Sequence, residues 1–163
     1  QLLPPAQMDR FMICTAIGYP DFESECAMAR GADSTRRTDA LEALMDAETL
    51  CAIRREVEAV FVHDAIARYA VRLIDATRRS PYLESGASPR GTLALVRMAK
   101  AAAWLQGNGF VGPGEIAEQF LPCTNHRVQL SVRARMENVD RETVLKQILE
   151  ETPRPKLQEK PRA

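Results

Sequence analysis

The sequence predicts a mainly α-helical fold, with a bundle of about four helices between residues 46 and 126. Apolar residues repeat at helical spacing along 64–79 and 89–105, and side-chain caps and Gly or Pro stops flank both stretches. By contrast, the short and nearly continuous apolar run at 11–17 is typical of a strand that is buried on both faces. We therefore expect a helical bundle preceded by one strand and one helix.

The composition of the chain argues against several classes of function. Lys plus Arg and Asp plus Glu number 22 each, so net charge does not favour nucleic acid or an anionic membrane as a partner. No run of about 18 apolar residues predicts a membrane span. The four cysteines contain no C-x-x-C pair, so we expect free buried thiols, no metal site and a cytoplasmic location.

The first part of the chain holds the predicted strand and one helix. The run Phe11–Ile17 ends at Gly18-Tyr19-Pro20, and a single strand cannot make a sheet. Either its partner strands lie outside this sequence or the run is not a strand. Asp21 is a good cap for a helix that reaches about Arg30, and Gly31 can end it.

The polar stretch 32–44 is the best candidate for a domain junction. We expect an irregular, Pro-rich tail at the C-terminus. The predicted parts are an incomplete first domain over 1–33, a linker over 34–45, a helical domain over 46–127, a short strand and C-terminal helix over 128–151, and a disordered tail over 152–163.

Two helices open the predicted bundle. Asp46 can cap a helix from Ala47 to about Glu58. The next helix, about Asp64 to Arg79, follows His63, a residue expected at a helix start. Its apolar stripe is the clearest in the chain and predicts these inward residues: Ile66, Tyr69, Ala70, Leu73 and Ile74.

The helix from Pro89 to about Leu105 is predicted to lie at the centre of the bundle. Ser88 is a good N-cap, Pro89 suits the first helical position, and Gly107-Asn108-Gly109 supplies the stop. The helix is apolar on most of its faces. The inward residues expected from its spacing are Leu95, Met98, Ala102 and Leu105.

Arg90 is the unusual residue of this helix. It lies in the first turn, where partial positive charge already makes a cation unfavourable. A bound anion would resolve the conflict. A surface arginine that reaches a nearby carboxylate is the simpler interpretation of the local pattern.

The remaining chain predicts two helices and a strand. A helix opened by Pro113 ends at Pro122 or one turn later, followed by His126 as a helix-end residue. Alternating apolar and polar residues over Val128–Arg133 favour a short strand. Asp140 can cap a last helix, whose expected inward residues are Val144, Leu145, Ile148 and Leu149.

Two motifs carry a family resemblance. The stretch from Leu3 to Phe11 resembles the "LPEAQLDRF" segment of the MoxR branch of the AAA+ ATPases, and Gly86-Ala87-Ser88-Pro89-Arg90 resembles its "GASPR" segment. Their order and separation also fit. Pro5 departs from the family's usual Glu. The resemblance covers about residues 2–130, with further landmarks at Gly18-Tyr19-Pro20, Tyr69, Ala76-Thr77-Arg78, Gly109-Phe110-Val111, Pro113 and His126-Arg127.

The resemblance implies a fold and site residues. The run at 11–17 would be the last strand of an α/β P-loop core, and the bundle would be the AAA+ lid domain. Arg90 would be the lid arginine that senses nucleotide phosphate, with Ser88 beside it. Arg10 would be the arginine finger that acts in trans on the nucleotide of a neighbouring subunit; its alternative is a structural Asp9–Arg10 pair.

The resemblance also implies a function. The chain would be the C-terminal lid fragment of an ATPase that couples ATP binding and hydrolysis to chaperone-like remodelling or maturation of an unknown client protein, in a homo-oligomeric, hexameric ring. ATP and Mg²⁺ would be its cofactors. Residues 1–163 contain neither the Walker A loop nor the Walker B acids. We expect both before Gln1, and we expect the chain alone to be inactive and to bind neither cofactor.

A non-enzymatic helical interaction or docking domain is the alternative function. It would use the basic stripe of Arg90, Arg97 and Lys100 as its docking face. Neutral net charge and the lack of aromatic residues among the basic ones argue against nucleic acid as its partner. A P-loop in the sequence upstream of Gln1 would decide between the two functions.

Overall fold

A computed structural model describes residues 3–31 and 41–156. They form two units: a helical unit (residues 3–14 and 55–156) and a small unit (residues 15–31 and 41–54). Most of the predicted linker over 34–45, and the last seven residues of the predicted tail over 152–163, lie outside the described residues.

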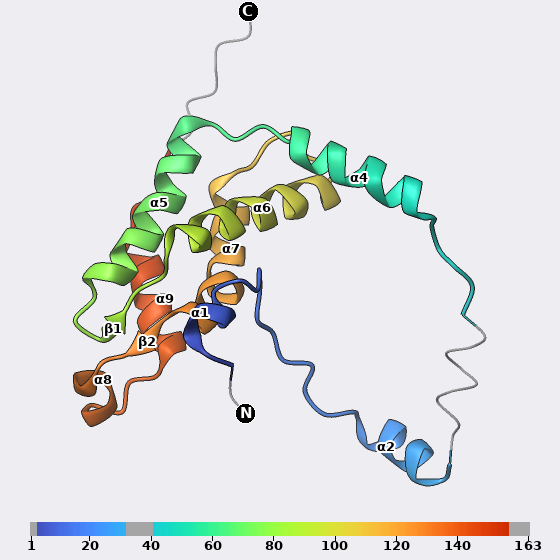
Figure 1. Cartoon of the computed structure of the whole chain (residues 1–163), viewed down its shortest axis with the longest axis horizontal. Helices are drawn as coiled ribbons and strands as arrows, with labels where there is room; N and C mark the ends of the chain where they lie inside the picture. Colours follow the sequence, from blue (N-terminus) through green and yellow to red (C-terminus); the bar gives the residue numbers. More distant parts are fainter. Residues whose placement is uncertain (1–2, 32–40, 157–163) are drawn as a thin grey trace, which may run out of the picture. The chain divides into compact units, whose positions relative to one another are not determined.

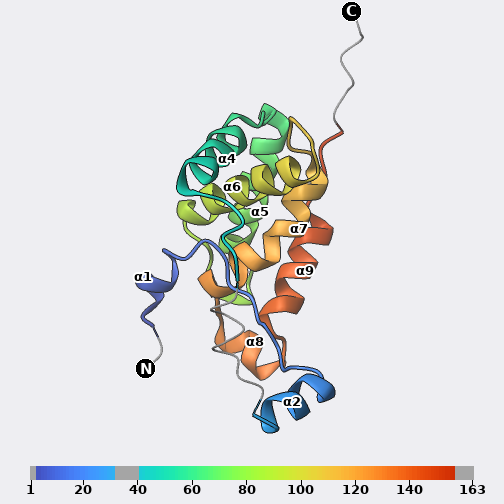
Figure 2. The ribbon, with the colours of Figure 1, turned by 90° about the vertical axis from the view of Figure 1, so that its right-hand side faces the viewer.

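Four helices form the core of the helical unit, and the fold is mainly α as predicted (Figures 1 and 2). They are α5 (Asp64–Arg79), α6 (Pro89–Leu105), α7 (Pro113–Thr124) and α9 (Arg141–Glu151). Helix α7 packs against α5, α6 and α9, and α5 also contacts α6 and α9. The largest fully buried side chains are Tyr69, Phe120, Ile66, Leu73, Ile74, Leu95, Ile116 and Leu145.

Helix α5 confirms its predicted bounds and stripe. The His63 ring accepts a hydrogen bond from the Ala65 N–H at 3.1 Å, which fixes the start of the helix. All five predicted residues are buried, together with Thr77. The Thr77 hydroxyl donates to the Ile74 carbonyl at 2.6 Å and accepts from the Ala87 N–H at 2.9 Å. This residue therefore ties α5 to the segment before α6.

Helix α6 also has its predicted bounds, but its inward face differs from the prediction. Leu95 is buried, Met98 and Ala102 are partly buried, and Leu105 is 77% exposed. The buried face consists mostly of small residues, namely Gly91, Ala94, Ala99 and Ala103 around Leu95. Small side chains let the neighbouring helices approach closely, so Leu105 at the end of the helix is not needed to fill the core.

Helix α7 continues past Pro122 to Thr124, the later of the two predicted ends. A proline in the last turn removes few helical hydrogen bonds, so the helix continues to a 3₁₀ turn, η1 (Asn125–Arg127). At the start of α7 the Gly112 N–H donates to the Glu115 carboxylate at 2.9 Å. His126 lies in η1 and is largely buried.

A two-stranded antiparallel sheet joins β1 (Leu83–Ser85) to β2 (Gln129–Leu130). The strand predicted over 128–133 is thus too long, because Ser131 caps a short helix, α8 (Val132–Met136), and accepts from the Ala134 N–H at 3.3 Å. Strand β1 was not predicted from the sequence. Its pairing with β2 is long-range and leaves no period-two pattern in three residues.

Helix α9 begins at its predicted cap: the Asp140 carboxylate accepts from the Thr143 N–H at 2.7 Å. Val144, Leu145 and Ile148 are buried as predicted, and Leu149 is partly buried against the core. The helix therefore closes one side of the bundle against α5 and α7.

The strand predicted at 11–17 is wrong: these residues have no regular secondary structure. A strand requires a neighbour to accept its backbone hydrogen bonds, and no strand of the described residues pairs with it. The Cys14 N–H donates to the Pro122 carbonyl at 2.9 Å instead. Before this segment, α1 (Pro5–Met8) is a single helical turn that contacts η1.

The small unit contains α2 (Phe22–Ala29) and the first part of α4 (Ala47–Ala59). Both start where predicted: Asp21 accepts from the Ser24 N–H at 2.8 Å, and Asp46 accepts from the Thr49 N–H at 2.7 Å. None of the residues described between 15 and 54 is buried.

The four cysteines are free, as predicted, but the expectation that they are buried holds only for Cys123. Cys14 and Cys51 are exposed, and Cys26 is partly exposed. The apolar residues around the first three predicted burial, but in those stretches the neighbouring residues described are themselves exposed or only partly buried.

Candidate functional site

A hollow of about 340 Å³ lies where the segment after α1 meets the start of α6, within the helical unit. Four of its eight lining residues are arginines and one is a carboxylate. The lining residues are Asp9, Arg10, Met12, Arg90, Leu93, Ala94, Arg97 and Arg127. The structure thus brings both sequence-predicted arginines, Arg10 and Arg90, to one hollow.

Helix α6 places two of these arginines. Ser88 caps the helix by accepting from the Arg90 N–H at 3.1 Å, which sets the first turn and the position of Arg90. Arg97 follows seven residues later on the same side of the helix, since seven residues make about two turns. Both side chains are exposed.

Asp9, which is partly exposed, and the buried side chain of Arg127 form an ion pair in the wall of the hollow. The Asp9 carboxylate pairs with the Arg127 guanidinium at 2.7 Å and accepts from the Ser88 hydroxyl at 2.9 and 3.0 Å. We call Asp9, Ser88 and Arg127 the Asp9 network. It shows that the predicted alternative for Arg10, a structural pair with Asp9, is wrong: the partner of Asp9 is Arg127.

The Arg127 side chain is only 2% exposed, yet each of its three nitrogens has a partner. Nε donates to the Cys123 carbonyl at 2.8 Å, Nη1 to the Asp9 carbonyl at 2.6 Å as well as to its carboxylate, and Nη2 to the Phe11 carbonyl at 2.6 Å. Burial of a charge requires such compensation. Arg127 is therefore fully engaged within the chain.

His126 supports the same segment. Its Nε2 lies 2.9 Å from the Phe11 carbonyl, so Nε2 must carry the hydrogen, because a carbonyl oxygen only accepts. The buried Nδ1 has no partner among the described residues. The Phe11 carbonyl thus accepts from both His126 and Arg127.

The hollow keeps an excess of positive charge. The charge of Asp9 is matched by Arg127, and no carboxylate of the described residues forms an ion pair with Arg10, Arg90 or Arg97. The simpler interpretation of Arg90, a pair with a nearby carboxylate, therefore finds no partner in this part of the chain. Exposed guanidinium groups beside a helix N-terminus can bind an anion such as phosphate.

The predicted docking stripe of Arg90, Arg97 and Lys100 is shorter than expected. The Lys100 ammonium donates to the Glu58 carbonyl at 2.6 Å, at the end of α4. Lys100 thus holds α6 against α4, and only Arg90 and Arg97 of the stripe line the hollow.

Sequence reasoning missed Asp9 and Arg127 as site residues. They are 118 residues apart, and no local pattern indicates that they meet. The only sequence signal was indirect, since Asp9 and Arg127 both lie in segments of the family resemblance. Ser88 was singled out as a candidate for cofactor binding, and its hydroxyl here donates to Asp9 and accepts from Arg90.

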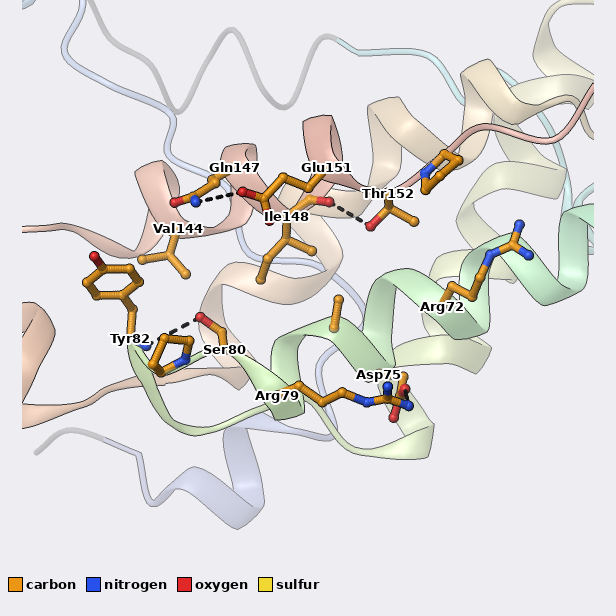
Figure 3. A pocket seen from close by; sticks show the side chains of 13 residues that line it. Arg72, Asp75, Arg79, Ser80, Tyr82, Val144, Gln147, Ile148, Glu151 and Thr152 are labelled. Atoms are coloured by element: carbon orange, nitrogen blue, oxygen red, sulfur yellow. Dashed lines mark hydrogen bonds and ion pairs between the residues drawn. The ribbon is translucent and has the colours of Figure 1, made fainter.

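A second hollow, a groove of about 630 Å³ between α5 and α9, is chemically different (Figure 3). Its apolar floor includes Tyr82 and Ile148, and several of its polar side chains pair with one another. Asp75 pairs with Arg79, and the Gln147 amide donates to Glu151 at 2.8 Å. The groove therefore lacks the excess charge of the first hollow.

Residues 3–31 and 41–156 show neither a metal-binding cluster nor a membrane-spanning helix. No group of three or more His, Cys, Asp or Glu side chains gathers there in a way that could hold a metal ion. Across the same residues, every helix is too short or too polar to traverse a bilayer.

Comparison with known proteins shows which family this chain resembles. Residues 75–148 match the model of the AAA lid domain. The uncharacterized protein YeaC of Bacillus subtilis is 33% identical over 148 residues, which cover 90% of this chain and 46% of that protein. Chaperone MoxR1 of Mycobacterium tuberculosis is 27% identical over 164 residues, which cover 95% of this chain and 43% of that protein.

A solved structure extends the match. A crystal structure from Cytophaga hutchinsonii, described as a "putative ATPase", superimposes with a TM-score of 0.84 at 28% identity and covers 96% of this chain and 50% of that one. The chain thus spans about half the length of the curated relatives it matches. From the lid-domain match, these relatives and the shared fold, residues 75–148 form an AAA lid domain, and most of the chain is similar to proteins of the MoxR branch.

Proposed function

We propose that this chain is the C-terminal part of an ATPase whose lid domain senses the bound nucleotide. In this proposal, ATP binding and hydrolysis drive the remodelling or maturation of a partner protein, in the cytoplasm and within a homo-oligomeric, hexameric ring. One observation carries the proposal: exposed arginines without carboxylate partners among the described residues line a hollow at the start of α6. The relative named as a chaperone supports the remodelling role.

In the proposed mechanism, Arg90 acts on the phosphates of its own subunit's ATP. Phosphoryl transfer needs little covalent chemistry from the protein, so catalysis depends on positioning and on neutralising charge. The Arg90 guanidinium can supply that charge from the first turn of α6, where a bound phosphate also relieves the conflict with the helix dipole. Ser88 contributes by holding this first turn in place.

The remaining parts of the catalytic site would come from sequence that precedes Gln1. A P-loop would hold the phosphates, and acidic residues would hold Mg²⁺ and position the attacking water. Arg10 would act in trans, on the nucleotide of the neighbouring subunit. Arg10 and Arg90 line one hollow in this chain. A separate experiment therefore tests whether Arg10 acts on the nucleotide of its own subunit or on that of a neighbour.

The first experiment measures ATP turnover and nucleotide affinity in the ATPase that contains this chain. Arg90→Ala should lower turnover or affinity by about tenfold or more, because a charge-assisted contact to phosphate is lost. Arg72→Ala is the matched control, since Arg72 is an exposed arginine outside the hollow. Unchanged turnover and affinity in Arg90→Ala would contradict the proposal.

The second experiment tests whether Arg10 acts in trans. Inactive Arg10→Ala subunits are mixed with subunits whose P-loop is defective. Mixed interfaces should regain some activity, because an intact P-loop then faces an intact Arg10. Absence of recovery at every mixing ratio, with assembly intact, would count against a role in trans.

The third experiment assays the 163-residue chain alone with Mg²⁺ and ATP. We expect no turnover above background, because two arginines without a phosphate cradle and a held metal ion cannot position the reaction. Turnover that Arg90→Ala abolishes would show that a complete site exists within residues 1–163.

A further inference from the structure

We propose that Asp9 and Arg127 are positioning residues that fix Arg10 and Arg90 relative to each other at the hollow. This inference rests on the proposed function for its catalytic consequence. Its structural part, the attachment of residues 9–14 to the lid by the Asp9 network, stands independently of ATP hydrolysis.

The network connects the two arginines through a short chain of hydrogen bonds. The Arg90 N–H donates to the Ser88 hydroxyl, and that hydroxyl donates to the Asp9 carboxylate. Arg10 is the next residue after Asp9 in the sequence. A shift of Asp9 would therefore move the backbone of Arg10 and release the hydroxyl that caps the helix of Arg90.

Arg127 holds Asp9 in this position from the lid side. Its guanidinium binds the carboxylate and the carbonyl of Asp9 together with the Phe11 carbonyl, at 2.6–2.7 Å. The planar fork of an arginine can satisfy several acceptors at fixed angles, which a lysine ammonium on a flexible stem cannot reproduce. The arrangement therefore specifies one geometry for residues 9–11.

Apolar packing offers this segment little alternative support. Residues 11–14 have no regular secondary structure, and Phe11, Met12 and Ile13 are 53%, 41% and 40% exposed. Among the described residues, the other hydrogen bonds from residues 11–14 to the lid are one from the His126 ring to the Phe11 carbonyl and one from the Cys14 N–H to the Pro122 carbonyl. The Asp9–Arg127 ion pair, with its buried guanidinium, is thus the main specific contact that places the segment.

The structural test is hydrogen exchange of the full 163-residue chain. The Cys14 amide, which donates to Pro122, reports whether the segment is attached. Asp9→Asn keeps the size of the side chain but leaves the buried Arg127 charge uncompensated. It should speed exchange at Cys14 by about tenfold or more, while amides of α5 and α7 keep their protection.

Three further variants sharpen this test. Arg127→Lys should also speed exchange at Cys14, because one ammonium cannot replace the fork. Ser88→Ala should have a smaller effect, since it removes one neutral donor. Glu84→Gln is the matched control: Glu84 forms an exposed pair with Arg135 at 3.7 Å, and its loss should leave Cys14 unchanged.

The catalytic test is a double-mutant cycle in the ATPase that contains this chain. If Asp9 acts by positioning Arg90, Asp9→Asn should lower kcat by about tenfold in the wild-type background. In an Arg90→Ala background it should lower kcat by a clearly smaller factor, because only its effect through Arg10 remains. A residue that only supports the fold would lower kcat by the same factor in both backgrounds.

The outcomes separate the inference from the proposed function. Unchanged exchange at Cys14 in Asp9→Asn overturns the inference whatever the ATPase does. Faster exchange with equal kcat losses in the two backgrounds overturns the positioning role. Faster exchange in a protein whose turnover does not respond to Arg90→Ala contradicts the proposed function and supports the attachment by the Asp9 network.

Discussion

Helices α5 and α2 begin with the same kind of side-chain cap, but they lie in different environments. Each follows a side chain that accepts a hydrogen bond from the first turn, His63 in α5 and Asp21 in α2. Helix α5 buries six side chains, whereas α2 buries none, and Phe22 at its start is 76% exposed. A cap thus determines where a helix begins but not whether it belongs to a core.

The two helices differ in burial because only α5 has other helices packed against its apolar stripe in the described part of the chain. The stripe of α5 faces α6, α7 and α9. Around α2, large apolar side chains are exposed, among them Ile17, Tyr19 and Met28. Such a concentration of exposed apolar surface is typical of a protein interface.

Matched phenylalanine substitutions give the largest expected contrast in stability. Phe120→Ala in α7 removes a fully buried ring and should lower the free energy of unfolding by about 3–5 kcal/mol. Phe22→Ala in α2 should change it by no more than about 0.5 kcal/mol. Urea denaturation of the 163-residue chain measures both. Equal losses would show that the small unit has a core of its own.

Thiol labelling compares the two regions in the folded state. Burial raises the pKa of the Cys123 thiol to about 11, so about one thiol in a thousand is ionised at pH 8. Cys51 in the small unit is exposed. We expect an alkylating reagent to modify Cys51 at least about a hundredfold faster, as peptide mass spectrometry would measure. Comparable rates would mean that α7 opens readily.

At Gly86, before α6, the backbone lies close to the backbone of Arg78 in α5, and a substitution can test this close contact. A Cβ added there would lie 2.6 Å from the Arg78 backbone nitrogen, so Gly86→Ala should cost about 1–3 kcal/mol. At Gly114, in the first turn of α7, a Cβ would meet nothing within 4 Å. Gly114→Ala should be neutral or stabilising by up to about 1 kcal/mol. Thermal unfolding of both variants measures the difference, and a stable Gly86→Ala would contradict the close approach.

Of these changes, acidification should have the smallest effect on stability, and that effect should be confined to the helix caps. Hydrogen bonds from the backbone of Ser24 and Thr143 lower the pKa of Asp21 and Asp140 below the usual 3.8. Because the folded-state pKa is lowered, each cap stabilises its helix above the unfolded-state pKa, and this contribution is lost as pH falls through the folded-state value.

We expect α2 to lose helical structure in that pH window and α9 to keep it, since Val144, Leu145 and Ile148 anchor α9 in the core. Backbone chemical shifts measured between about pH 5 and about pH 2 would show this. Asp21→Asn, which keeps a cap without a titrating group, should make α2 insensitive to the change. Loss of both helices together would contradict the comparison.

The limits of the helices were predictable because their causes lie within a few residues. Ser88 and Pro89 mark the start of α6, and Asp140 marks the start of α9, through contacts to the next turn of the same segment. The stripe of α5 was equally visible, because apolar spacing repeats along one helix. The candidate arginines, Arg10 and Arg90, came from motifs of a known family, and their roles in catalysis stay predictions.

Other features depended on residues far apart in the sequence. The strand expected at 11–17 did not form, because a strand exists only with a neighbour that accepts its hydrogen bonds. The pairing of β1 with β2 joins Leu83 to Leu130 and has no local signature.

The candidate site shows the same division between local and long-range causes. The sequence by itself determined that Arg90 lies in the first turn of a capped helix, because the cap and the helix are adjacent. Only the tertiary structure decided that Asp9 pairs with Arg127 and that Arg10 lies beside Arg90. A buried ion pair depends on distance in space and on desolvation, and neither quantity is encoded in the spacing of residues along the chain.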